Sequence, residues 1–429
     1  MTSADDPLVS RPLASGPTSE PAGGFGQSRP VASLDTPESI AAEVSARIEE
    51  FLESKSAEFL TISPDAADIG RALVDFTRGG KRIRPVLLWW GYQLVSELGF
   101  DETSLTAGVA DAAGSLELLH AAALIHDDVI DHSDTRRGSP ALHRQFESRH
   151  RERAFQGEGE SFGVAAAIVI GDICLALSEE LFERSQATLG ITASARELRA
   201  TIRRDVMVGQ YLDVLAEVIP LDDERIGDRA WEVLSFKSAK YSVEQPLLLG
   251  AALGGASEEQ LTEISRFGLP LGQAFQLRDD VLGIFGDPEA TGKPAGDDIR
   301  EGKRTVLIAE SMKNLAPDQI RLLAERLGDP KLSDTEVAEC VAMLADAGGL
   351  KAVEDYIDAK HAEALAVIDS WASGDEALAS ESDARVPRNT VPPNTVPRDA
   401  EAGRARVRIG AEAKNQLTAF ADALSYRQK

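Results

Sequence analysis

Apolar residues recur at intervals of three and four through most of this chain, the spacing that places them on one face of an α-helix. The first such stripe includes Ile40, Val44 and Ile48, and it follows Thr36-Pro37, an N-cap residue before a proline at the first helical position. The same spacing predicts helices over residues 63–80, around Leu87, and over 105–131, 163–182, 198–217, 231–253, 258–285, 305–315 and 334–371. No window of comparable length alternates like a β-strand, so the pattern predicts an all-α fold.

The pattern also divides the chain. Residues 1–35 are rich in Ser, Pro, Gly and Ala and predict a disordered tail without the basic start and apolar centre of a signal peptide. Residues 36–371 carry the predicted helices and are interpreted as one large domain. Residues 372–404 contain a tandem NTVP repeat and predict a low-complexity insertion. Residues 405–429 predict a last helix that packs back on the domain.

Charge and cysteine content narrow the function. The apolar content of 43% is ample for a large core, and the formal net charge of −26 argues against binding to nucleic acid or to an anionic membrane surface. The chain has no stretch of about 20 uninterrupted apolar residues, so no membrane span is expected. The two cysteines, Cys174 and Cys340, are too few and too far apart for a disulfide framework, which favours a reducing cytoplasm.

Residues 116–143, which read LELLHAAALIHDDVIDHSDTRRGSPALH, change from an apolar helix to a cluster of charge. Asp127 and Asp131 are four residues apart, so on a helix their carboxylates lie on one face, with Asp128 beside the first. Two arginines and a Gly/Pro turn follow. Acids at the end of an apolar wall indicate a place where a metal and a charged ligand meet an apolar cavity.

A similar arrangement recurs about 150 residues later, in GQAFQLRDDVLGIFGDPEATGKPAGDDIREGKRT. An apolar helical segment again ends in paired acids, Asp279 and Asp280, followed by Gly/Pro turns with spaced lysines and arginines. One acidic cluster alone is explained equally well by a solvated helix end. Two clusters far apart in the sequence predict two helices that face each other across one site.

Four segments together resemble the motifs of trans-isoprenyl diphosphate synthases of the polyprenyl synthetase family. DDVID and FQLRDDVLGIFGD are similar to its two Asp-rich motifs, and GGKRIRP at residues 79–85 and FKSAKY at residues 236–241 are similar to two further signatures. The resemblance implies one all-α domain around a central apolar cavity, and a homodimer. The implied reaction joins isopentenyl diphosphate head-to-tail to an allylic diphosphate, namely dimethylallyl, geranyl or farnesyl diphosphate.

The resemblance also implies roles for the acidic residues. Three Mg²⁺ ions per active site are expected, because Mg²⁺ bridges carboxylates and phosphate oxygens and neutralises the charge of a diphosphate leaving group. The expected ligands are Asp127, Asp131 and Asp279, with Asp128 and Asp280 in support. Gly283 stands where many relatives have a third aspartate. Some short-chain synthases also carry glycine there, so activity is expected to survive.

By the same resemblance, the basic residues form two groups. The allylic diphosphate is expected to contact Arg136, Lys237 and Lys293. The diphosphate of isopentenyl diphosphate is expected to contact Lys81, Arg84, His120 and Arg137. Gln276 corresponds to a position near the reacting allylic carbon, and Ser238 replaces a threonine whose hydrogen bond its hydroxyl can make. Asp298 and Lys303 match further positions of the second motif region. The residues expected to act in catalysis are Asp127, Asp128, Asp131, Lys237, Gln276 and Asp279.

Small residues before the first motif set the expected product length. The growing chain is expected to run along the apolar helix behind Asp127, where Ala122 and Ala123 form the floor. Members of the family that stop at fifteen carbons tend to place aromatic rings there, whereas Leu119, one turn deeper, is large enough to close the cavity. The sequence therefore predicts all-trans geranylgeranyl diphosphate as the product, with longer polyprenyl diphosphates or farnesyl diphosphate as alternatives.

Other classes of function fit the sequence less well. A class I terpene cyclase needs a second metal motif with a central hydroxyl, and the nearest segment, GDICLALSEE, lacks it. A His-Asp phosphohydrolase centred on His126 and Asp127 needs further metal-binding histidines, and the chain has six in total. A non-catalytic subunit of a heteromeric prenyltransferase remains an alternative, although such subunits usually have degraded Asp-rich motifs.

Overall fold

The central element of the fold is α4 (Thr103–Ile130), a helix of 28 residues that ends inside the first Asp-rich motif. It packs along α6 (Gly159–Leu189) and against α1 (Pro37–Ile62) and α3 (Ile83–Gln93). The structure is a computed structural model, and it describes residues 36–95, 103–286, 296–373, 407–409 and 411–427. The predicted tail at residues 1–35 and nearly all of the predicted insertion lie outside these residues.

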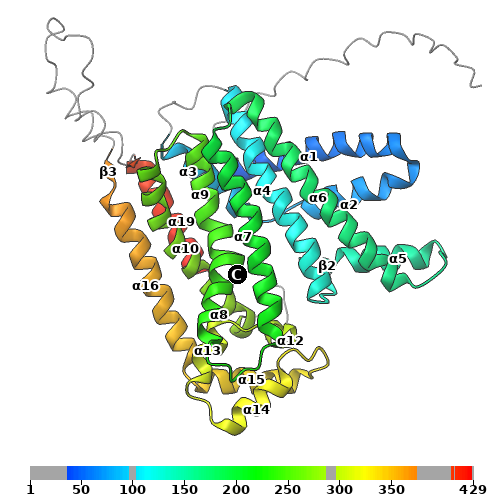
Figure 1. Ribbon diagram of the computed structural model, residues 1–429, viewed down its shortest axis with the longest axis vertical. Coiled ribbons are helices and arrows are strands. Elements are labelled where there is room, and N and C mark those ends of the chain that lie inside the picture. Colours follow the sequence, from blue (N-terminus) through cyan, green and yellow to red (C-terminus); the bar gives the residue numbers. More distant parts are fainter. Residues whose placement is uncertain (1–35, 96–102, 287–295, 374–406, 410, 428–429) are drawn as a thin grey trace, which may run out of the picture.

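The other elements that the structure describes form a largely helical array with α4 (Figure 1). The remaining helices are α2 (Ala67–Thr77), α5 (Leu142–Glu152), α7 (Ala193–Val218), α8 (Ile226–Val233), α9 (Gln245–Leu253), α10 (Glu258–Phe285), α12 (Asp297–Glu301), α13 (Val306–Met312), α14 (Pro317–Arg326), α15 (Asp334–Asp346), α16 (Gly349–Ser370) and α19 (Ala411–Ser425). A 3₁₀ turn, η1 (Pro64–Ala66), and a π-helical segment, η2 (Leu234–Glu244), complete the helices described. The strands β1 (Thr135–Arg136) and β2 (Ser139–Pro140) pair antiparallel, and β3 (Ala372–Ser373) and β4 (Arg408–Ile409) pair parallel. The all-α prediction is confirmed.

Two apolar clusters fill the interior of the described chain. The larger lies among α1, α3, α4, α6 and α9 and includes Leu116, and the smaller lies among α10, α13 and α15 and includes Leu344. α10 contributes Phe267 to the first and Leu277 to the second. Each fully buried side chain of this size stabilises the fold by roughly 1.5–3 kcal/mol. The helix that carries the second Asp-rich motif thus packs into both apolar clusters.

The first helix starts at the predicted cap residue, Thr36. At α1 the backbone N–H of Ser39 donates to Oγ1 of Thr36, and the N–H of Thr36 donates to Oγ of Ser39, each at 3.2 Å. α10 begins and ends where its apolar spacing predicts, with Ser257 and Gln260 forming the same reciprocal cap. The signature FKSAKY lies in the π-helical segment η2, and its wider turn is a frequent feature of functional sites.

The structure differs from the predicted helices in two ways. The single helix predicted over residues 334–371 is two helices, α15 and α16, because Gly348 between them has a φ of 79°, a left-handed conformation that glycine adopts easily. The short helices α5, α12 and α14 were not predicted. Their sequences are strongly polar, so they lack the broad apolar stripe by which the longer helices are found.

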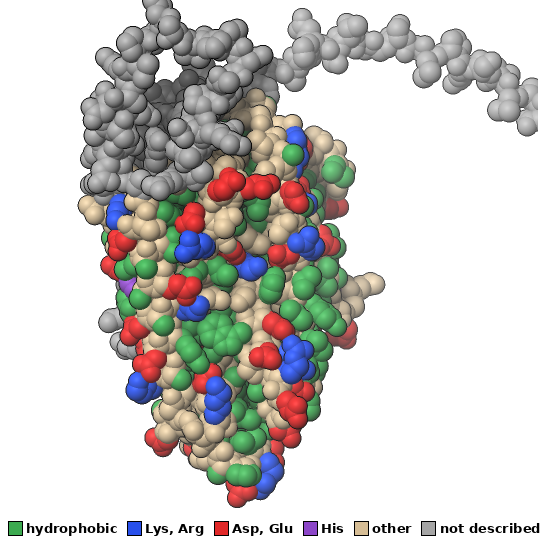
Figure 2. Space-filling view, turned by 60° about the vertical axis from the view of Figure 1, so that its left-hand side comes forward, with side chains coloured by type: hydrophobic (Ala, Val, Ile, Leu, Met, Phe, Trp, Pro, Cys, Tyr) green, Lys and Arg blue, Asp and Glu red, His purple; other side chains and the backbone are tan. Residues whose placement is uncertain are grey.

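Two of the described helices, α4 and α6, are long and apolar enough to span a membrane by length and composition. The apolar window of α4 is 83% buried within the protein and that of α6 is 39% buried. Core helices of globular proteins pass the same test, and α4 is such a helix here. The face shown in Figure 2 mixes basic and acidic side chains with hydrophobic ones, and it carries no continuous basic stripe.

Candidate active site

The two Asp-rich motifs face each other across a shared cavity. α4 carries Asp127 in its last turn with Asp131 just beyond it, and α10 carries Asp279 and Asp280 in its final turns. A first cavity of about 670 Å³ is lined by Asp279 and Asp280, and a second cavity of about 540 Å³ is lined by Asp127. The two cavities share several lining residues, Lys237 among them. The predicted pairing of two helices across one site is therefore present.

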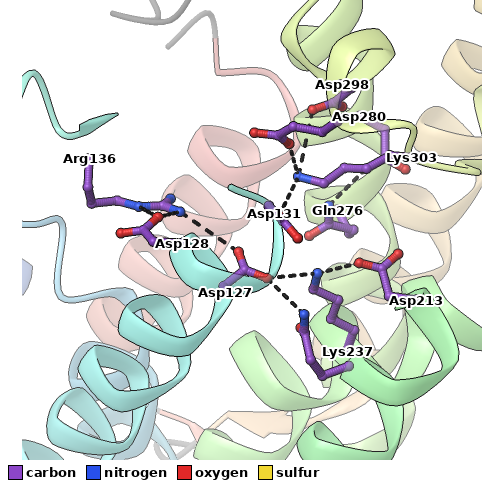
Figure 3. Close-up of polar contacts among 12 residues, drawn as sticks. Asp127, Asp128, Asp131, Arg136, Asp213, Lys237, Gln276, Asp280, Asp298 and Lys303 are labelled. Atoms are coloured by element: carbon purple, nitrogen blue, oxygen red, sulfur yellow. Dashed lines mark hydrogen bonds and ion pairs between the residues drawn. The ribbon is translucent and has the colours of Figure 1, made fainter. Parts of the chain in front are cut away.

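Asp127 is held by two side chains from other helices (Figure 3). Nε2 of Gln210 on α7 donates to Oδ1 of Asp127 at 2.9 Å, and Nζ of Lys237 lies 3.2 Å from the same oxygen. Lys237 also pairs with Asp213. Burial favours the protonated form of Asp127, but Lys237 and the more distant Lys303 outweigh it and hold the pKa of Asp127 below its usual value. Asp127 is therefore ionised.

Two other carboxylates at the site resist ionisation. Burial, followed by repulsion from Asp127, raises the pKa of Asp131 to about 7. Burial also raises the pKa of Asp280 well above its usual value, although Nε2 of Gln276 donates to Oδ1 of Asp280 at 2.8 Å. A nearby positive charge lowers the pKa of such carboxylates again, so that they ionise. The site is therefore suited to a divalent cation.

Lys303 lies between the two acidic walls (Figure 3). Its Nζ is 3.8 Å from Oδ2 of Asp131 and 4.0 Å from Oδ1 of Asp298, and it also pairs with Glu301. Burial opposes its charge, but these carboxylates raise the pKa of Lys303 well above its usual value. A permanent cation therefore already stands among the acids that were predicted to bind metal.

Asp128 faces away from the cavity and supports the segment after α4. It is fully buried, and Nε of Arg136 donates to its Oδ1 at 2.7 Å. Nη2 of the same arginine lies 3.8 Å from Oδ2 of Asp127. The structure thus shows Asp128 holding Arg136, and its predicted part in catalysis and in support of the metal ligands stays a prediction. Arg136 lines the first cavity and thus links the buried Asp128 to the site.

The residues predicted to bind the second diphosphate are brought together at the second cavity. Lys81, Arg84, His120 and Arg137 all line it. Nη2 of Arg84 donates to Oγ of Ser242 at 2.7 Å, and its guanidinium lies 4.4 Å from the centre of the Tyr241 ring. Burial, reinforced by Arg84 and Arg137, lowers the pKa of His120 well below its usual value, so this imidazole is neutral. Three cations and a neutral hydrogen-bonding ring form a site for an anion.

The apolar side of the second cavity continues behind Asp127. It is lined by Ala123, Leu124 and Phe275. Ala122 is instead buried in the core on the side of α4 that faces Cys174 of α6, and it is absent from the described lining of both cavities. Successive residues of an α-helix point about 100° apart, so neighbouring residues can differ in whether they reach a cavity. Of the two alanines predicted to form the floor, Ala123 lies in the described lining of the second cavity, and the predicted floor itself stays a prediction.

Comparison with known proteins identifies this arrangement. The family model described as "Polyprenyl synthetase" matches residues 68–344. The chain belongs to the polyprenyl synthetase family. The resemblance based on the four sequence motifs is therefore confirmed, and like other members of this family the chain is a trans-prenyltransferase that makes prenyl diphosphates.

Members of the polyprenyl synthetase family with similar sequences and structures differ in their products. A crystal structure of geranylgeranyl pyrophosphate synthase from Corynebacterium glutamicum, complexed with isoprenyl diphosphate and magnesium, is 34% identical with a TM-score of 0.75, and covers 92% of this chain and 100% of that one. The short chain isoprenyl diphosphate synthase of Methanocaldococcus jannaschii is 31% identical over 62% of this chain and 72% of its own. The geranylfarnesyl diphosphate synthase of Aeropyrum pernix is 30% identical over 71% of this chain and 86% of its own.

Some residues of the site were not found from the sequence. Gln210 and Asp213 on α7 were missed because nothing in their local sequence distinguishes them from a polar helix face. Arg427, just after α19, pairs with Asp279 and lies 4.2 Å from the centre of the Phe275 ring. The one sequence feature that marks Arg427 is that the last residues of this acidic chain include Arg427 and Lys429. Lys293, predicted to contact the allylic diphosphate, lies outside the described residues.

Proposed function

We propose that this prenyl diphosphate synthase condenses isopentenyl diphosphate with dimethylallyl, geranyl or farnesyl diphosphate to make all-trans geranylgeranyl diphosphate. The observation that carries the proposal is the continuous path from the facing Asp-rich motifs, past Lys237 and Gln276, to the apolar wall at Ala123. The acidic end suits a diphosphate with its metal ions, and the apolar end suits a prenyl chain. Longer polyprenyl diphosphates and farnesyl diphosphate are the alternative products.

The acids present fit the Mg²⁺ that this family is expected to use. Among the described residues, no three acids or histidines form a closed metal cage. That suits Mg²⁺, which is commonly held by one or two carboxylates and completes its shell with phosphate oxygens and water. In this proposal, three Mg²⁺ ions would be held by Asp127 and Asp131 on one wall and by Asp279 on the other. Bound there, Mg²⁺ neutralises the growing charge of the leaving diphosphate.

The basic residues position the two substrates by charge. Lys237 keeps its proton, since Asp127 and Asp213 outweigh the effect of burial and raise the pKa of its ammonium group. With Arg136 it is placed to hold the allylic diphosphate and to favour its departure. The diphosphate of isopentenyl diphosphate is held by the cations around the second cavity. Apolar walls there exclude water, which would otherwise quench a carbocation.

The proposed assembly is a homodimer joined through α6 and α7. These helices expose hydrophobic side chains that the described chain leaves uncovered: Ile168, Val169, Met207, Val208, Tyr211, Val214 and Val218. Val218 is 76% exposed and Tyr211 is 64% exposed. Soluble monomers rarely expose many neighbouring apolar side chains, so such a surface indicates an interface.

The test is a product analysis of the purified protein. Labelled isopentenyl diphosphate and Mg²⁺ are supplied with each allylic starter in turn, and the products are resolved by chain length. A dominant twenty-carbon product is expected from all three starters. A ladder of longer chains would show that the floor of the cavity lies deeper than Ala123 and that the proposed product is wrong. The absence of any Mg²⁺-dependent condensation would contradict the proposal.

A further inference from the structure

The loop of residues 78–82, which joins α2 to α3, has a strained backbone at Arg82. Gly79 and Gly80 have φ angles of 76° and 92°, and Arg82 has a φ of 51° and a ψ of 36°. Glycine adopts such left-handed conformations freely, whereas an arginine does so at a cost in conformational energy. A strained residue persists only where the surrounding structure holds it, and such residues cluster at functional sites. Arg82 is therefore held by contacts outside the loop.

The guanidinium group of Arg82 bonds to three helices at once. Its Nε donates to Oγ of Ser45 on α1 at 3.0 Å, and its Nη1 donates to Oε2 of Glu117 on α4 at 2.8 Å. Its Nη2 donates to the backbone oxygen of Thr77, the last residue of α2, at 2.6 Å. The side chains of Arg82 and Glu117 are only 4% and 5% exposed. The planar fork of an arginine can make such bonds in several directions, so this one side chain fixes the loop to α1, α2 and α4.

The loop that Arg82 fixes carries cations of the second cavity. Lys81 precedes Arg82, Arg84 follows two residues later, and both line that cavity. The loop also meets a third cation, since a Cβ atom on Gly80 would lie 3.1 Å from Nη2 of Arg137. Arg82 itself lines the cavity, but all three nitrogens of its guanidinium already donate to the protein. Arg82 is therefore placed to act through the loop rather than as a ligand of the diphosphate.

From this geometry we propose that Arg82 is a positioning residue, which holds the loop so that Lys81 and Arg84 converge on the diphosphate of isopentenyl diphosphate. The inference rests on the proposed function, because it concerns the substrate that the second cavity is proposed to hold. A buried ion pair often adds little stability compared with apolar side chains of the same volume. In this chain the pair of Arg82 and Glu117 instead selects one conformation of a strained loop.

Binding of isopentenyl diphosphate, measured by calorimetry without an allylic substrate, tests this role apart from catalysis. Arg82→Ala is expected to weaken binding by about tenfold or more, because the cations of the loop lose their fixed positions. In steady-state assays the KM for isopentenyl diphosphate should rise in parallel, and the KM for the allylic substrate should stay within about twofold of wild type. Arg47→Ala is the matched control: Arg47 pairs with Asp111 and so also joins α1 to α4, but it lines neither cavity. Its affinity for isopentenyl diphosphate should match that of wild type.

A double variant separates the position of the loop from the stability of the protein. Arg82→Ala leaves the strained backbone in place and the buried Glu117 carboxylate unpaired, and both effects lower the melting temperature. Arg82→Gly/Glu117→Gln removes the strain and the unpaired charge, so it is expected to melt at a higher temperature than Arg82→Ala. Its affinity for isopentenyl diphosphate should stay as low as that of Arg82→Ala, because the loop still lacks its contacts with α1 and α2. If Arg82→Ala fails to fold, the double variant decides the test.

The outcomes distinguish the role of Arg82 from the proposed function. If wild type condenses its substrates and either Arg82→Ala or the double variant binds isopentenyl diphosphate as wild type does, only the role of Arg82 is wrong. The same holds if Arg47→Ala weakens binding as much as Arg82→Ala, since general destabilisation then accounts for the loss. If wild type neither binds isopentenyl diphosphate nor condenses it, the proposed function is wrong and the role of Arg82 falls with it.

Discussion

Asp127, Asp131 and Asp280 show how the charges of single residues prepare the site. Asp127 is ionised because Lys237 lies 3.2 Å away, whereas burial and like charges raise the pKa of the other two. Added positive charge would allow all three to ionise together. A divalent cation bound at the site would therefore stabilise the charged forms of Asp131 and Asp280.

Lys237 is expected to act mainly on the chemical step. Lys237→Ala removes a buried cation from the leaving diphosphate and is expected to lower kcat by roughly a hundredfold, with a smaller change in KM for the allylic substrate. Steady-state kinetics with Lys240→Ala, one turn along η2, provide the control. Equal kcat values for the two variants would contradict this role.

Glu217 on α7 is expected to make stability depend on pH. Burial, with Asp213 nearby, raises its pKa from 4.5 to about 7. Between these values the unfolded chain has already released the proton that the folded chain retains, so the contribution of Glu217 to stability is present below pH 4.5 and is lost as pH rises to about 7. Thermal melts from pH 4.5 to 8 should therefore show a smaller decline for Glu217→Gln than for wild type. The exposed Glu224→Gln should melt like wild type, and a decline in Glu217→Gln equal to that of wild type would exclude this origin.

At the scale of elements, helix position decides which residues reach the cavity. The bounds of α10 follow from its apolar spacing and from the Ser257 cap, both of which are local. The break at Gly348 was missed because apolar spacing continues on both sides of it. Ala122 and Ala123 were both predicted to form the floor, and only the packing of α4 against α6 separates them. Local patterns thus predict where helices run, and tertiary packing decides their rotation.

Ala123 is expected to control product length. Ala123→Phe places a ring in the second cavity and is expected to shift the main product from twenty carbons to fifteen, as resolved by chromatography of the dephosphorylated products. Ala122→Phe is the comparison: its ring would overpack the core and destabilise the protein by about 1–3 kcal/mol without shortening the product. A twenty-carbon product from Ala123→Phe would show that the floor lies elsewhere.

At the scale of the whole molecule, the sequence predicted the acidic walls but not all of their partners. Asp127 and Asp279 were found because each sits in a short motif that can be read along one helix. Gln210 and Arg427 are brought to those acids by α7 and by the segment after α19, from positions far away in the chain. Contacts of this kind depend on the complete fold, so no local spacing predicts them.

The exposed faces of α6 and α7 predict the state of assembly. Light scattering of wild type should give twice the mass of one chain. Tyr211→Asp places a charge in the proposed interface and is expected to give a monomer. Leu322→Asp alters a hydrophobic side chain that is 37% exposed on α14 and should leave the dimer intact. A monomeric wild type would contradict the interface.

The most direct test of the two-walled site is a crystal structure with Mg²⁺, isopentenyl diphosphate and a thiolo analogue of dimethylallyl diphosphate that does not ionise. We expect metal ions between the analogue and Asp127, Asp131 and Asp279, with Arg427 displaced from Asp279. The second diphosphate should lie among Lys81, Arg84 and Arg137. Ions bound elsewhere, or an Arg427–Asp279 pair that stays intact beside a bound analogue, would contradict the account.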